Sequence, residues 1–240
     1  MTVASWGLRG TEVVRGPQCE GVTEGPWVEP VSALTSWSFV VGAVLIVALA
    51  RPTVDTRASW VRVRTYAVLV AAVGIGSFVE HGPDPAWSDV AHDLPLLATL
   101  AFLGADAAAD LAGRTRSWWM WTLPTAVVLP VVALAPRAGD VAQVALAAAA
   151  VLLTVLRARA QPRLRRPVTV GLALLAVGAG IGTMSRAGWP WCDPSSPWQG
   201  HGAWHVLAAA ALVVMAPTVG HVGRLGPRFA RPARRSRGPS

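Results

Sequence analysis

Seven predominantly apolar stretches, each close to 20 residues long, divide most of this 240-residue chain. A helix of about 20 apolar residues is long enough to cross the hydrocarbon core of a bilayer. Only 14% of the residues are charged, whereas soluble domains carry about a quarter. We therefore predict an all-α integral membrane bundle of seven transmembrane helices. The predicted spans are residues 31–50, 63–81, 89–108, 117–136, 140–157, 167–185 and 200–220.

The remaining sequence divides into two short flanking segments. Residues 1–30 form an external segment that contains several glutamates, glycines and prolines. It lacks the charged-then-apolar layout of a signal peptide, so the first span is expected to stay in the mature protein. The transmembrane domain is predicted over residues 31–221. Residues 222–240 form a basic tail that we predict to be disordered and cytoplasmic.

The basic residues predict the orientation of the bundle. All 21 of them are arginine. Together with the excess of alanine, valine, glycine and proline, this is typical of a GC-rich genome and favours a bacterial source. Seventeen arginines lie in the tail or on the side of the membrane where the first, third, fifth and seventh spans end. Four lie on the side where these spans begin. The positive-inside rule then places the N-terminus outside and the C-terminus in the cytoplasm of a plasma membrane. The four arginines on the outer side are Arg9, Arg15, Arg137 and Arg186.

The net charge of +8 therefore reflects membrane topology. No base-reading motif accompanies the basic tail, which argues against a nucleic-acid partner. Arginines next to a membrane more often contact anionic lipid headgroups. The lipid bilayer, and a lipid substrate, are the partners that we expect.

Two cysteines, Cys19 and Cys192, precede the first and the last span. With seven spans both fall on the outer side, where oxidation is permitted. They either form a disulfide that fastens the N-terminal segment over the outer end of the bundle or remain free thiols. We favour the disulfide, although sequence alone does not establish the pairing.

Three histidines carry the strongest functional signal. His201 and His205 lie four residues apart in HGAWH at the start of the last span, and His81 ends the second span. Ser77 lies one helical turn before His81. Residues four apart return to nearly the same face of a helix. The predicted topology brings these side chains, and His92 and Asp93 of the third span, to the same outer level of the membrane, where ionisable residues usually mark function.

This arrangement indicates a catalytic zinc site. Catalytic zinc takes three protein ligands and keeps one open position, and His81, His201 and His205 supply three imidazoles. Zinc activates water near neutral pH and polarises a carbonyl group. Asp93 is then a candidate general base or orienting residue, and Ser77 a candidate donor to the developing oxyanion. His92 is either a supporting or substitute polar ligand or an interfacial residue. Histidines also suit iron, nickel and copper.

The same residues resemble the CREST superfamily of seven-helix membrane hydrolases, and within it the alkaline ceramidases. The resemblance covers most of the chain by the order of its elements, and three blocks of sequence carry it. CEGVTEGPWVEPVSALTS (19–36) is similar to the family's N-terminal Cys-Glu segment. GIGSFVEHG (74–82) with HDLPL (92–96) is similar to its serine, histidine and acidic motifs. HGAWH (201–205) matches its closing histidine pair.

The resemblance implies zinc on His81, His201 and His205, and hydrolysis of a lipid amide such as ceramide or another N-acyl lipid. It also implies the Cys19–Cys192 disulfide. Counting from His81, the family's aspartate falls on His92 and its glutamate on Asp93. We expect Asp93 to face the site, with His92 as the alternative.

The family also binds calcium through its N-terminal segment, where Glu20 and Glu29 match acidic positions. Pro17 and Gln18 replace the family's Asp-Trp before the cysteine. We therefore regard a calcium site as doubtful and expect solvated carboxylates.

Two other functions fit the same scaffold. One is a receptor-like or structural membrane protein in which the metal has no catalytic role. The other is a metal-ion transporter that uses the histidines as a transit site. A transporter predicts polar residues across the whole bilayer, whereas here they cluster at one end, with mainly Asp106 beyond. Asp106 itself is expected to be structural or to face a water-filled cavity.

Overall fold

A computed structural model describes residues 18–50 and 57–220 of the chain. The predicted tail, with His221, and most of the N-terminal segment lie outside the described residues. The described part is all-α apart from one isolated β-bridge between Gln18 and Arg186. The helices are α1 (Pro30–Ala50), α2 (Arg57–His81), α3 (Ser88–Leu111), α4 (Trp119–Leu134), α5 (Pro136–Ala160), α6 (Arg165–Met184) and α7 (Gly200–Gly220), with a 3₁₀ turn, η1, over Pro162–Leu164.

Six of these helices are long and apolar enough to cross a membrane, which supports a multi-pass membrane protein. The exception is α4, which has 16 residues and is therefore about 24 Å long. The helix bounds agree closely with the expected spans, and the largest difference is at the start of α2. That helix begins at Arg57, whereas the predicted span begins at residue 63. The prediction began later because the first turns of the helix contain arginines, which the apolar pattern excludes.

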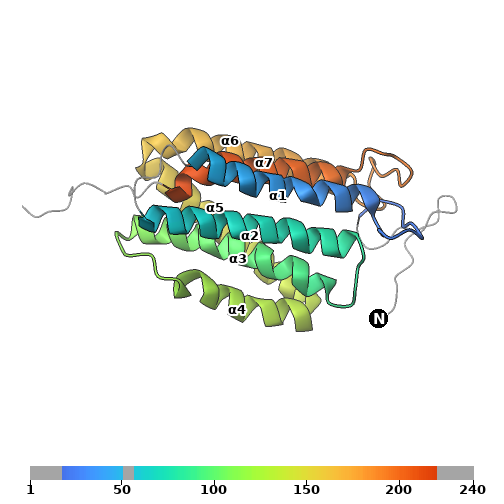
Figure 1. The fold of residues 1–240 in the computed structure, drawn as a ribbon, viewed down its shortest axis with the longest axis horizontal. Coiled ribbons are helices and arrows are strands. Elements are labelled where there is room, and N and C mark those ends of the chain that lie inside the picture. The colour runs from blue at the N-terminus through green and yellow to red at the C-terminus, as the bar shows by residue number, and fades with distance from the viewer. Residues whose placement is uncertain (1–17, 51–56, 221–240) are drawn as a thin grey trace, which may run out of the picture.

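The helices run alongside one another in one elongated bundle (Figure 1). α1 packs against α2 and α7, and α2 also packs against α3. α3 in turn packs against α4 and α5, and α6 packs mainly against α7. The main core lies between α1, α2, α3 and α7 and includes Phe39, Tyr66, Val70 and Phe102. This packing brings the end of α2 and the start of α7 together, although they are far apart in sequence.

Exposed tryptophans mark both ends of the bundle. Trp118 and Trp119 lie at the start of α4, at one end. The opposite end holds the exposed tryptophans Trp27, Trp37, Trp87, Trp189, Trp191 and Trp198. Tryptophan is enriched at the two interfaces of a membrane, so this distribution fits a bundle that spans one.

The N-terminal segment is fastened over the end of the bundle where α2 finishes and α7 begins. Cys19 forms a disulfide with Cys192, which confirms the predicted pairing. The neighbouring Glu20 is buried, and its carboxylate accepts hydrogen bonds from the backbone N–H groups of Val31 and Ser32, at 2.6 and 2.9 Å. The first N–H groups of a helix lack partners within the helix. Glu20 therefore caps α1 from outside the helix.

An ion-pair network closes the opposite end of the bundle. Asp106 and Asp110 on α3 are both buried, and they pair with three arginines from different elements. Arg62 of α2 pairs with Asp106, whereas Arg116 and Arg157 each pair with both aspartates. Asp106 is thus part of a structural network. These pairs also explain how Arg157 can be buried near the end of α5, since a paired arginine can be buried.

The network generates a stability prediction. Asp106→Asn leaves three guanidinium groups, of which that of Arg157 is buried, with one carboxylate, and breaking one side of a buried pair costs about 3–5 kcal/mol. We expect a marked fall in the thermal unfolding midpoint of the detergent-purified protein. Asp140→Asn is the matched control, because Asp140 is exposed on α5. Equal midpoints for the two variants would contradict a stabilising role for the network.

Candidate metal centre

Three imidazoles from two helices meet at the disulfide-bonded end of the bundle. His81 is the last residue of α2, and His201 and His205 lie in the first two turns of α7. One ligand nitrogen of each lies within 4.8 Å of the others. His81 and His205 are buried, whereas His201 is partly exposed. The three histidines therefore form a group that could hold a metal ion.

Glu29 orients His81. Its carboxylate accepts a hydrogen bond from Nδ1 of His81 at 2.5 Å, and both side chains are buried. Backbone bonds hold the two residues together, because the Glu29 N–H donates to the His81 carbonyl at 2.8 Å and the Val28 N–H to that of Gly82 at 2.9 Å. With the Nδ1 proton held by Glu29, the lone pair of neutral His81 lies on Nε2. A carboxylate in this position is the usual partner of a metal-ligating histidine.

Thr35 plays the same part for His205. The Thr35 hydroxyl donates to the carbonyl oxygen of Val31 at 2.8 Å, so its oxygen is left to accept from Nδ1 of His205 at 3.2 Å. The hydrogen-bond network thereby assigns the Nδ1–H tautomer to His205 and leaves its Nε2 lone pair free. Nε2 of His81 lies 3.1 Å from Nε2 of His201. The available nitrogens thus turn toward one place.

Ser77 lies beside the histidines, as its position one turn before His81 predicts. Its hydroxyl oxygen is 3.3 Å from Nε2 of His205 and 2.9 Å from the hydroxyl oxygen of Ser36 on α1. Ser36 donates its own proton to the carbonyl oxygen of Ser32 at 2.7 Å. The Ser77 hydroxyl can therefore donate to Ser36, and a small rotation turns it toward the histidines.

Two glycines in GIGS bring Ser77 this close to its neighbours. A Cβ atom at Gly74 would lie 2.8 Å from the carbonyl oxygen of Ser36, and one at Gly76 would collide with that of Ala91. α1 and α3 therefore approach α2 at backbone distance on either side of the serine. A larger residue at either glycine would push these helices apart and move Ser77 from the histidines.

The donor set fits a metal such as zinc. Imidazole nitrogens bind zinc at about 2.0–2.1 Å, so two ligands of a tetrahedral ion lie about 3.3 Å apart. The 3.1 Å between the Nε2 atoms of His81 and His201 is close to that spacing. Three histidines in one group also leave the fourth tetrahedral position open to another molecule. Imidazole donors do not by themselves distinguish zinc from iron, nickel or copper.

His92 and Asp93 form a separate group at the same end. Nδ1 of His92 lies 3.1 Å from an Asp93 carboxylate oxygen and 3.3 Å from one of Glu80. These three side chains are only partly buried. No hydrogen bond or ion pair between described residues joins Asp93 to the three histidines. The structure thus brings Ser77 to the histidines and pairs Asp93 with His92 instead.

The two glutamates considered for calcium have partners within the chain. Glu20 caps α1 with both carboxylate oxygens, and Glu29 contacts His81. Both are buried, so the expectation of solvated carboxylates was wrong. Among the described residues, His81, His201 and His205 form the one group of three or more such side chains whose ligand atoms are placed to hold a metal ion. The role of Glu29 as the partner of His81 could not be read from spacing, because 52 positions separate the two residues.

No known family model matches the chain, and no curated protein is detectably similar to it. The likeness to the CREST superfamily therefore remains a prediction that rests on short motifs.

The geometry predicts the metal content of the purified protein. Wild type should carry about one metal ion per chain, and His81→Ala and His205→Ala should each lose it, because two imidazoles rarely retain a metal. His92→Ala is the matched control, since His92 lies at the same end but outside the group. Elemental analysis of protein purified without chelator checks this. Equal metal loss in the control would contradict the assigned ligands.

The contact between Glu29 and His81 gives a second prediction. Glu29→Gln keeps the shape of the side chain but weakens the acceptor that fixes the tautomer of His81. Loss of such a partner typically lowers metal affinity about 10- to 100-fold. Competition with a chromophoric chelator measures the change. Glu24→Gln is the control, because Glu24 is an exposed glutamate in the same segment, and an unchanged affinity in Glu29→Gln would contradict the proposed orientation.

Proposed function

We propose that this protein is a metal-dependent hydrolase, with zinc as the metal, that cleaves the amide bond of a membrane lipid. The observation that carries the proposal is the group of three histidines whose free nitrogens face one another, with the Ser77 hydroxyl 3.3 Å from His205. When bound, zinc supplies a Lewis acid that activates water and polarises a carbonyl group.

The side chains around the histidines have distinct parts in the proposal. His81, His201 and His205 hold the metal, and Glu29 and Thr35 fix the imidazoles in the tautomer that binds it. Ser77 donates a hydrogen bond to the carbonyl oxygen of the substrate as negative charge develops there. In the overall reaction water adds to the carbonyl carbon, the C–N bond breaks, and the nitrogen leaves as an amine with one added proton.

The leaving nitrogen needs a proton, and the attacking water must lose one. Glu80, His92 and Asp93 form a hydrogen-bonded group at the same end of the bundle, partly open to the surroundings. We assign the exchange of protons with the surroundings to this group, with Asp93 as its main acid–base residue. Asp93→Ala is then expected to lose turnover while it retains the metal.

The position of the site favours a lipid substrate. The histidines lie at the end of the bundle that carries most of the exposed tryptophans, which is the level of lipid headgroups. Phe78, next to Ser77, lies 5.8 Å from the ring of Trp27 and 5.4 Å from that of Trp37. Both tryptophans are exposed, so an apolar aromatic surface lies at the same end of the bundle as the site. An N-acyl lipid, ceramide among them, places its amide at this depth.

The core between the two ends argues against a metal-ion transporter. On α2, the buried positions between Arg62 and Ser77 are apolar or glycine, apart from Tyr66. The Tyr66 hydroxyl donates to the carbonyl oxygen of Leu212 and is thereby satisfied. A transit path needs polar groups along its length, whereas the described polar clusters lie at opposite ends of the bundle.

Hydrolysis can be tested directly on the purified, metal-loaded protein. Incubation with an N-acyl sphingoid lipid in mixed micelles should release a free fatty acid that mass spectrometry detects. Ser77→Ala should lower kcat roughly 10²- to 10³-fold, because it removes a donor to the developing oxyanion, while its metal content stays at the wild-type level.

Ser38→Ala serves as the matched control. Ser38 lies on α1, and its buried hydroxyl has no hydrogen-bond partner among the described residues. This variant should keep wild-type turnover. A metal-loaded wild type that releases no fatty acid from a panel of N-acyl lipids would overturn the hydrolase and favour a receptor-like or structural protein.

A further inference from the structure

The ion-pair network at the end opposite the histidines has an uneven charge. Arg62, Arg116 and Arg157 contribute three positive charges, and Asp106 and Asp110 contribute two negative ones. Arg116 and Arg157 each bridge both aspartates, whereas Arg62 contacts Asp106 alone. Among the described residues the network therefore retains one net positive charge, and Arg62 is the member with the fewest ion pairs.

Arg62 also has unused hydrogen-bond donors. Only its Nη2 atom bonds to Asp106, and its Nε and Nη1 atoms are buried without a hydrogen-bond partner among the described residues. A buried donor without a partner costs free energy, and a charged donor costs more than a neutral one. These two nitrogens are enclosed, so an anion beside Arg62 would act by balancing the remaining charge of the network.

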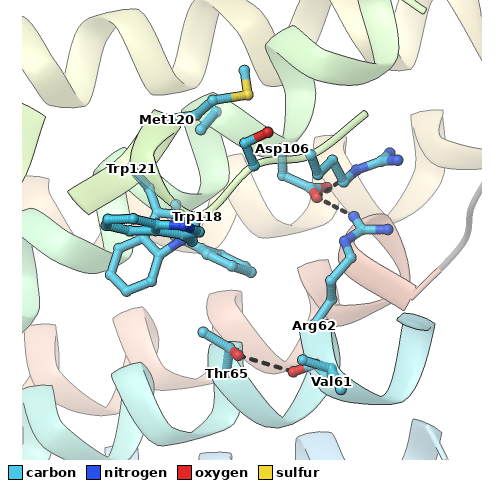
Figure 2. Close-up of a pocket in the computed structure, with 11 residues that line it drawn as sticks. Val61, Arg62, Thr65, Asp106, Trp118, Met120 and Trp121 are labelled. Carbon is cyan, nitrogen blue, oxygen red and sulfur yellow. Dashed lines mark hydrogen bonds and ion pairs between the residues drawn. The ribbon is translucent and has the colours of Figure 1, made fainter. Parts of the chain in front are cut away.

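A cavity lies beside this guanidinium group. It has a volume of about 180 Å³ and is lined by Arg62 of α2, by residues of α3 such as Ala105 and Asp106, and by Arg116, Trp118 and Trp121 at the start of α4. Figure 2 shows the two tryptophans on one side of this space and Arg62, with its bond to Asp106, on the other. The cavity thus joins a cationic wall to an aromatic wall.

We propose that this cavity binds the phosphate group of an anionic phospholipid. Guanidinium groups bind phosphate oxygens through charge-assisted hydrogen bonds, and Arg62 and Arg116 both face the cavity. The tryptophans favour a lipid over a soluble phosphate ester. Trp118 is mostly exposed, and tryptophan rings typically lie at the headgroup level of a membrane. The lipid lies at the opposite end of the bundle from the histidines and is distinct from the proposed substrate.

Native mass spectrometry of the full-length protein in detergent tests the proposal. The probes are phosphatidylglycerol and phosphatidylcholine with the same acyl chains, and inorganic phosphate in a parallel thermal-shift measurement. We expect phosphatidylglycerol to bind preferentially. Arg62→Gln should weaken that binding roughly tenfold or more, since a positive charge in the cavity wall is lost.

Two further variants separate the cavity from general surface charge and from folding. Arg64→Gln removes one positive charge at the same end of α2, but Arg64 is exposed and lies outside the cavity lining. Its affinity for phosphatidylglycerol should stay within about twofold of wild type, as expected for a distant surface charge. Ala105→Leu fills the cavity without altering any charge and should weaken binding as Arg62→Gln does.

The outcomes are distinct. Preferential binding of phosphatidylglycerol that both cavity variants weaken supports the proposal. Equal weakening by Arg64→Gln would show attraction to the surface alone and overturn it. Binding of inorganic phosphate without phosphatidylglycerol would overturn the lipid as occupant, and equal affinity for both lipids would overturn the role of charge.

Discussion

The hydrogen bond between Glu29 and His81 is the contact on which the site depends. It joins the residue that precedes α1 to the residue that ends α2, and two backbone bonds reinforce it. The disulfide and the cap that Glu20 places on α1 hold the same segment in position. An imidazole buried at the end of an apolar bundle must have its polar atoms satisfied. The N-terminal segment supplies that partner, and so it is part of the site.

The polar clusters of the described residues lie at the two ends of the bundle, and the buried polar groups are satisfied differently at each end. Near the histidines, uncharged polar side chains and two carboxylates are satisfied by hydrogen bonds to residues of α1, α2 and α7. At the other end, arginines and aspartates form ion pairs across α2, α3 and α5. The apolar core around Tyr66, Val70 and Phe102 separates them. This division lets one end carry the proposed chemistry while the other stabilises the packing.

The sequence predicted the features that depend on periodicity and topology. The apolar stretches indicated the helices, and the helix ends indicated that His81, His201 and His205 would meet. It did not predict the partners of these residues. Thr35 and Glu29 reach the histidines because α1 packs between α2 and α7. Their positions in the sequence do not indicate this packing. The partner of Asp93 could not be predicted for the same reason. Adjacent residues of a helix point about 100° apart, and only the packing of α3 decides that Asp93 pairs with His92.

The direction of the hydrogen bonds leaves one ring nitrogen of His81 and one of His205 available to a metal ion. Glu29 and Thr35 each hold an Nδ1 proton, which turns the lone pairs of His81 and His205 toward His201 and Ser77. The nearest acceptor of the Ser77 proton is Ser36, at 2.9 Å rather than the 3.3 Å to His205. The Nε2 lone pairs of His81 and His205 therefore lie beside His201 and Ser77. A metal cation there would be bound by these nitrogens, and the neighbouring Ser77 hydroxyl then suits the proposed reaction at a carbonyl group.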